Sequence, residues 1–185
     1  MCMRHSSLVD DQRRCQMREV WPRFNADSFL GEGFPYPGEL AYGYRNGFID
    51  GSLLVKVIER LACSEIPLTS EELEIAALFS GETDRIRYFA LQLSKYERSD
   101  ASEIWQYYFV SAVANGVSDP VEKFTILDSV WADLEYPDGM IQIIYPKEGF
   151  PAHLYPMLGG KALSDFLARW SEILARRDAR GRLHV

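Results

Sequence analysis

The chain of 185 residues is long enough for one domain with its own core, and its 47% hydrophobic content is ordinary for a globular protein. No apolar run approaches the roughly 20 residues that a membrane span needs, and residues 1–20 lack the apolar stretch of a secretory signal. Three widely spaced cysteines argue against a disulfide framework or a zinc site and favour a reducing compartment, which we take to be the cytoplasm. We expect Cys63 to be a small buried hydrophobe.

The net charge of −7 is unevenly distributed. Residues 1–24 carry five arginines and three acids, and residues 169–185 carry five arginines and two acids. Residues 25–168 therefore hold ten basic and twenty-two acidic side chains, a net charge of −12. Such a body repels nucleic acid and anionic membranes and attracts basic partners, although solubility alone is an alternative explanation.

In chain order, residues 1–20 have no sustained periodicity and predict a poorly ordered basic arm. Residues 21–185 are expected to form a single helical domain. Its first segment, 21–38, is rich in aromatics, proline and glycine and predicts irregular structure.

Helical signals begin at Glu39. A short helix should stop at Asn46-Gly47, and Asp50 should cap the next one, whose aliphatic residues recur on one face. Thr69 and Glu72 have the spacing of a capping box at the start of a third helix.

Four further helices are expected. One covers about 83–97, a second begins at the Asp100 and Glu103 pair, and a third begins at Asp119-Pro120 with Glu122 and ends before Pro137. Residues 147–160 look like a loop, and the last helix should cover about 161–177. The segment 140–145 fits a short strand or a short helix.

The fold class predicted by these elements is all-α (mainly α). Six to seven helices with short links favour consecutive antiparallel hairpins, because no run of alternating strands occurs. The large apolar residues of the helix faces predict a buried cluster of Trp105, Phe109, Phe124, Leu127, Trp131, Phe166 and Trp170.

The common catalytic motifs are absent. No phosphate-binding glycine loop, metalloprotease motif, paired-cysteine motif or serine nucleophile elbow occurs. Gly159-Gly160-Lys161 could hold an anion at a helix start, but a flexible hinge is the more ordinary interpretation. His153 has no cysteine or histidine at ligand spacing. We therefore predict no catalytic residue, no metal and no cofactor.

The stretch "VWADLEYPDGMIQIIYP" from Val130 to Pro146 sets acids among aromatic residues. Three interpretations stay open: a structural turn at Pro-Asp-Gly, a protein-docking surface, and a metal or catalytic site. The partner-binding residues on the docking interpretation are Asp133, Glu135, Tyr136 and Asp138. A second acidic choice is the group of Glu71, Glu72 and Glu74.

Three blocks of the sequence resemble the bacterial family called domain of unknown function 2247. They are "YGYRNGFIDGSLLVKVIERLA", "LTSEELEIAAL" and "DPVEKFTILDSVWADLEYPDGMIQIIYP", and the resemblance covers about 40–146. The family pattern has an aromatic residue where this chain has Leu134. The resemblance implies no catalytic residues. The family is similar in size and style to immunity proteins of bacterial polymorphic toxin systems.

We therefore expect a non-enzymatic acidic binding protein that neutralises a basic toxin domain by occlusion, as a monomer or homodimer. Two alternatives remain. One is an enzyme whose site is assembled from scattered residues, such as Asp133 with His153. The other is a helical scaffold or homodimer with no neutralising role.

Overall fold

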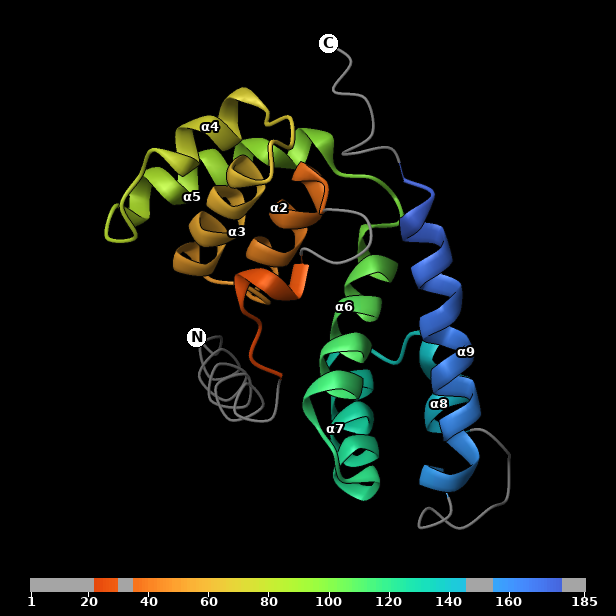
Figure 1. The fold of residues 1–185 in the computed structure, drawn as a ribbon. Coiled ribbons are helices and arrows are strands. Elements are labelled where there is room, and N and C mark those ends of the chain that lie inside the picture. Colours follow the sequence, from red (N-terminus) through yellow and green to blue (C-terminus); the bar gives the residue numbers. More distant parts are fainter. Residues whose placement is uncertain (1–21, 30–34, 146–154, 178–185) are drawn as a thin grey trace, which may run out of the picture. The chain divides into compact units, whose positions relative to one another are not determined.

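The computed structural model describes residues 22–29, 35–145 and 155–177, and these ranges contain helices and no strand (Figure 1). The all-α prediction is confirmed, with eight α-helices and three 3-10 helices in the described part of the chain. The elements are η1 (Ala26–Phe29), α2 (Pro37–Arg45), α3 (Gly51–Cys63), α4 (Ser70–Ala76), α5 (Thr83–Gln92), η2 (Leu93–Tyr96), α6 (Ala101–Gly116), α7 (Pro120–Asp133), η3 (Asp138–Met140), α8 (Ile141–Ile144) and α9 (Tyr155–Ala175).

The chain packs as two units. Of the described residues, those within 24–108 and 164–177 belong to the larger unit, and residues 22–23, 109–145 and 155–163 belong to the smaller unit. The divisions fall inside α6 and α9, so each of these helices contributes residues to both units. A single domain over 21–185 stays a prediction, and the predicted arm, 1–20, lies outside the described residues.

Three predicted helix starts are confirmed. The carboxylates of Asp50 and Asp119 each accept a backbone N–H three residues further on, both at 2.8 Å. Thr69 and Glu72 form a reciprocal capping box that is buried. These bonds satisfy backbone donors that the first turn of a helix leaves unpaired.

Three helices end in the same way, with the chain turning through a left-handed residue. The N–H groups of Phe48, Ile66 and Tyr136 each bond a carbonyl five residues back, which is the closing bond of a Schellman motif. Gly47 has the left-handed conformation at the end of α2, as the sequence predicted, with φ of 72°. At the ends of α3 and α7 the equivalent residues are Glu65 and Glu135, with φ of 57° and 62°.

We expect Glu65→Gly and Glu135→Gly each to raise the free energy of unfolding by about 1 kcal/mol or slightly less. A side chain other than glycine disfavours the left-handed region by about 1–2 kcal/mol, and the greater freedom of glycine in the unfolded chain offsets part of the gain. Urea denaturation of the two single variants checks this. A loss of stability in both would show that the glutamate side chains stabilise these turns.

The core of the larger unit is built around Trp105, which is 1% exposed. Its ring lies within 5.7 Å, between centroids, of the rings of Phe29, Phe48 and Tyr108. Gly43 of α2 lies so close to this indole that an added Cβ would overlap it. Helices α2, α3, α4 and α5 pack together in this unit (Figure 1).

The core of the smaller unit comes from α7, α8 and the beginning of α9. The buried stripe of α7 is Phe124, Leu127 and Val130. It follows Val130 and not Trp131, which lies one position or about 100° round the helix, so Trp131 is half-buried at the edge of the predicted stripe. Gly159 lies against Phe124 and the carbonyl of Ile143, which brings α9 onto this stripe.

Other local predictions need correction. Trp105, Phe109, Phe124, Leu127 and Trp170 are buried as expected, but Phe166 is half-buried on the flank of its helix. Cys63 is exposed, because it lies two residues beyond the last buried position of α3. Residues 140–144 are helical, so the segment 140–145 does not form a strand, and the predicted helix 83–97 is divided into α5 and η2. Helix α9 begins at Tyr155, so the Gly-Gly-Lys sequence lies inside it and cannot be an anion site or a hinge at a helix start.

Candidate functional site

The predicted docking segment follows α7 as a tightly bonded turn. The indole Nε1–H of Trp131 donates to the carbonyl of Pro137 at 3.1 Å, which ties the turn back to the helix. The rings of Tyr136 and Tyr145 pack against that indole, with centroids 4.8 and 5.2 Å away and steep interplanar angles. Such edge-to-face pairs are the favoured geometry of aromatic side chains. Trp131 therefore anchors the turn although it is only half-buried.

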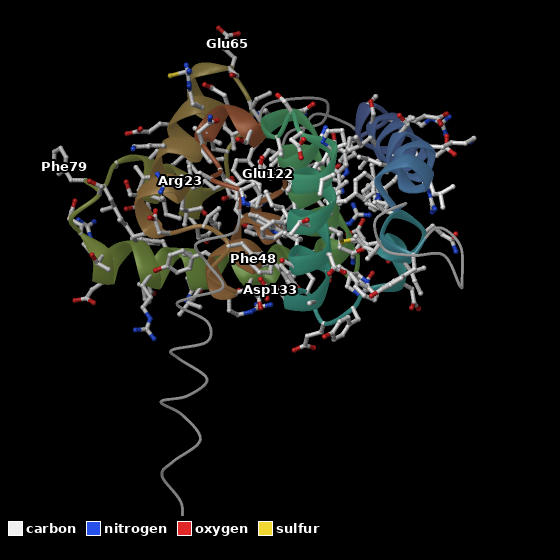
Figure 2. The ribbon with its side chains drawn as sticks, turned by 90° about the horizontal axis from the view of Figure 1, so that it is seen from below. Arg23, Phe48, Glu65, Phe79, Glu122 and Asp133 are labelled. Carbon is white, nitrogen blue, oxygen red and sulfur yellow. The ribbon has the colours of Figure 1, made fainter. Side chains whose placement is uncertain are left out.

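The four predicted partner-binding residues differ in exposure. Glu135 and Asp138 are exposed, and 61% of Tyr136 is accessible to solvent. Asp133, marked in Figure 2, lies in the last turn of α7 and is half-buried. Glu135 and Tyr136 are consecutive left-handed residues, with φ of 62° and 60°. The structure thus places an acid, a tyrosine and a second acid on one exposed, tightly bonded turn.

The second acidic group is not a continuous surface. Glu72 is fully buried, and its carboxylate accepts hydrogen bonds from the backbone N–H and the hydroxyl of Thr69. Glu71 binds Lys95 at 2.6 Å and Tyr96 at 3.2 Å, and the hydrogen bond from Lys95 lowers the pKa of Glu71. Of the three acids only Glu74 is exposed. Capping and ion pairing therefore account for this group.

A buried charge pair was missed from the sequence. The guanidinium of Arg177, just after α9, donates to Glu39 in the first turn of α2 at 2.8 Å, and their side chains are 9% and 2% exposed. Tyr36 supplies a backbone N–H to the same carboxylate at 3.1 Å, and its ring lies 4.6 Å from the guanidinium carbon. The hydroxyl of Tyr108 reaches Glu39 at 3.4 Å.

Burial has the largest effect on the pKa of Glu39. It raises the pKa of Glu39 above its ordinary value of 4.5, although Arg177 and the N–H of Tyr36 act in the opposite direction. Burial also raises the pKa of Tyr108 well above 10.0, and the neighbouring Glu39 raises it further. Removing water from a charged group disfavours the charged form. The only sequence signal was a lone carboxylate among apolar neighbours in "GELA", 138 residues from Arg177.

Asp100, which precedes α6, joins this cluster. Its Oδ1 is buried and accepts no hydrogen bond from the described residues, but lies 3.5 Å from Nε of Arg98. Its Oδ2 lies 3.9 Å from Arg177. The cluster thus contains two carboxylates and two guanidinium groups, whose formal charges balance.

An open groove in the larger unit has a volume of about 640 Å³. Its wall includes Lys56, Glu59, Cys63 and the ion pair of Arg60 with Asp27 at 3.0 Å. No group of three histidine, cysteine, aspartate or glutamate side chains in the described ranges is arranged to hold a metal. His153, the suggested partner of Asp133 in an enzyme site, lies outside those ranges.

The fold and the site define an all-α protein with a rigid acidic and aromatic turn on its surface and a buried glutamate–arginine pair in its core. The chain belongs to the bacterial family described as "uncharacterized protein conserved in bacteria", domain of unknown function 2247, whose model matches residues 27–177. This match extends beyond the 40–146 recognised from motifs and includes both Glu39 and Arg177. Neither the curated proteins nor the solved structures contain a match. In the part of the chain that the structure describes, no helix combines the length and apolar character of a membrane span.

Proposed function

We propose that this protein is a non-enzymatic binding protein of the cytoplasm whose acidic surface occludes a basic partner, in the manner of an immunity protein that neutralises a toxin domain. The observation that carries the proposal is the turn after α7. It displays Glu135, Tyr136 and Asp138 to solvent on a backbone that the indole of Trp131 holds in place.

Rigid display favours binding because little freedom is lost when the partner arrives. Tyrosine is a frequent interface anchor, since it offers a large apolar area with few rotatable bonds. The left-handed conformation of Glu135 and Tyr136 has a cost in stability that glycine would avoid, and such local strain gathers at functional positions. The charge of −12 over residues 25–168 would speed the approach of a basic partner.

The test begins with a pulldown from the source bacterium and uses the captured partner in binding kinetics. We expect Glu135→Gln with Asp138→Asn to slow association and flatten its dependence on salt, because the two exposed charges of the turn are removed while its bonds are kept. The matched control is Glu65→Gln with Asp128→Asn, which removes two exposed charges elsewhere. Equal kinetics for both double variants at low salt would reject this turn as the docking surface.

A further inference from the structure

Cations in this fold repeatedly combine with a tyrosine ring and a carboxylate. In each case one cationic side chain lies over the ring and binds the acid at the same time. Three sets with short ion pairs are Tyr36 with Arg177 and Glu39, Tyr42 with Arg45 and Glu97, and Tyr96 with Lys95 and Glu71, and a fourth, looser set is Tyr36 with Arg98 and Asp100. In the first three sets the cations lie 4.6, 5.7 and 4.9 Å from the ring centroids and 2.8, 2.8 and 2.6 Å from the carboxylates.

The turn after α7 has two of these three parts. Tyr136 supplies an exposed ring, and Glu135 and Asp138 supply exposed carboxylates at neighbouring positions. Among the described residues no basic side chain lies over Tyr136 or pairs with either of these two acids. The ring packs against Trp131, so it is held in place while most of it stays open to solvent.

We propose that an arginine side chain of a basic partner protein completes this set, with its guanidinium stacked on Tyr136 and hydrogen-bonded to Glu135 or Asp138. This inference rests on the proposed function and names the chemical group that the docking turn recognises. Arginine fits better than lysine, because its planar guanidinium can stack on a ring and donate two parallel hydrogen bonds to a carboxylate. The turn itself contributes acceptors and a π-face but no cation, so it is complementary to this group.

The experiment uses the full-length protein and a short synthetic probe, the acetylated and amidated peptide Gly-Arg-Gly-Arg-Gly. Nitrogen-labelled protein is titrated while the indole N–H signal of Trp131 is followed by NMR, after assignment with Trp131→Phe. We expect this signal and the backbone amide of Tyr136 to shift with saturation at millimolar peptide. The peptide with citrulline in place of arginine, which keeps the shape and loses the charge, should shift neither signal. Equal shifts with both peptides would overturn the proposal.

Variants separate stacking from general charge attraction. Tyr136→Leu keeps an apolar side chain and removes the aromatic face. It should lower the affinity for the arginine peptide by roughly two- to five-fold, the contribution of an exposed cation–π contact. Tyr88→Leu is the matched control, because Tyr88 is 60% exposed on α5, away from the turn in sequence. Unchanged affinity for the Tyr136→Leu variant would overturn arginine stacking.

The outcome is distinguishable from a failure of the proposed function. A captured partner that loses affinity with Glu135→Gln and Asp138→Asn, but not with Tyr136→Leu, would leave the docking turn intact and reject the arginine site. An arginine peptide that binds at Tyr136, while the captured partner ignores all three substitutions, would support the site and reject the turn as the surface for that partner.

Discussion

Arg177→Met should lower the free energy of unfolding by about 3–5 kcal/mol at neutral pH, the cost of leaving one member of a buried ion pair without its partner. Glu39, which is 2% exposed beside Arg177, would keep the N–H of Tyr36 and the hydroxyl of Tyr108 as hydrogen-bond donors among the described residues. Urea denaturation measures the loss. The control is Arg176→Met, since the adjacent Arg176 pairs with Glu172 on the surface and such pairs contribute about 0–1 kcal/mol.

The loss should depend on pH in a defined direction. A carboxyl whose pKa is higher in the folded chain binds its proton more tightly there, so its contribution to stability falls as the pH rises above its unfolded pKa. Glu39 is such a group, with a pKa raised above 4.5 by burial. In the Arg177→Met variant the pKa of Glu39 should be higher still, because Arg177 no longer lowers it. The free energies of unfolding of variant and parent should therefore come closer together as the pH falls toward 4.5 and Glu39 becomes protonated. A difference that is constant with pH would show that Glu39 is not the group left unpaired.

The double variant Glu39→Leu with Arg177→Met tests whether the pair contributes stability at all. Replacing both charges by apolar side chains is often neutral or stabilising, because the cost of removing two ions from water disappears. We expect the double variant to recover most of the stability that Arg177→Met loses. The structural role of the pair is then to hold the end of α9 against α2 in one arrangement.

Trp105→Ala should lower the free energy of unfolding by about 3–5 kcal/mol, because it removes a fully buried ring and leaves a cavity. The cavity would open between Phe29, Phe48 and Tyr108 of the larger unit. The indole Nε1–H, which donates to the backbone carbonyl of Glu39 at 2.8 Å, would also be lost. Both Trp105→Ala and Trp105→Phe lose this hydrogen bond, which should cost about 1 kcal/mol, but Trp105→Phe keeps an aromatic ring in the core. The difference between their denaturation midpoints therefore reports the cost of the larger cavity.

Trp131→Ala is the matched comparison. A tryptophan of the predicted buried cluster would cost about 3–5 kcal/mol on truncation. Because the structure leaves Trp131 half-buried, about 2 kcal/mol is the better expectation. A larger loss for Trp131→Ala than for Trp105→Ala would contradict this ranking.

Local signals account for what could be predicted. A cap at Asp50, Thr69 or Asp119 satisfies backbone donors within three residues, so a short stretch of sequence contains both partners. The helical fold class follows from the repetition of such signals with apolar faces between them. The turn after α7, whose residues are proposed to bind a partner, was recognised in the same way, because proline, glycine and clustered acids mark a helix end.

Features that depend on distant or unusual contacts could not be predicted. Glu39 and Arg177 are separated by 138 residues, and no pattern in either neighbourhood points to the other. The left-handed Glu65 and Glu135 take a conformation for which glycine is the expected residue, so propensity argues against them. Trp131 is less buried than the other tryptophans of the predicted cluster, because the buried stripe of α7 passes through the preceding residue, Val130.

The buried ion pair of Glu39 with Arg177 also has a consequence for synthesis on the ribosome. Its two members are 138 residues apart in the chain, so Glu39 is synthesised well before Arg177. Domains fold as units while translation proceeds from the N-terminus, and contacts of large sequence separation form late. The carboxylate of Glu39 therefore stays without its guanidinium partner until Arg177 has been synthesised, and a chain that stops before Arg177 must keep that carboxylate hydrated or protonated.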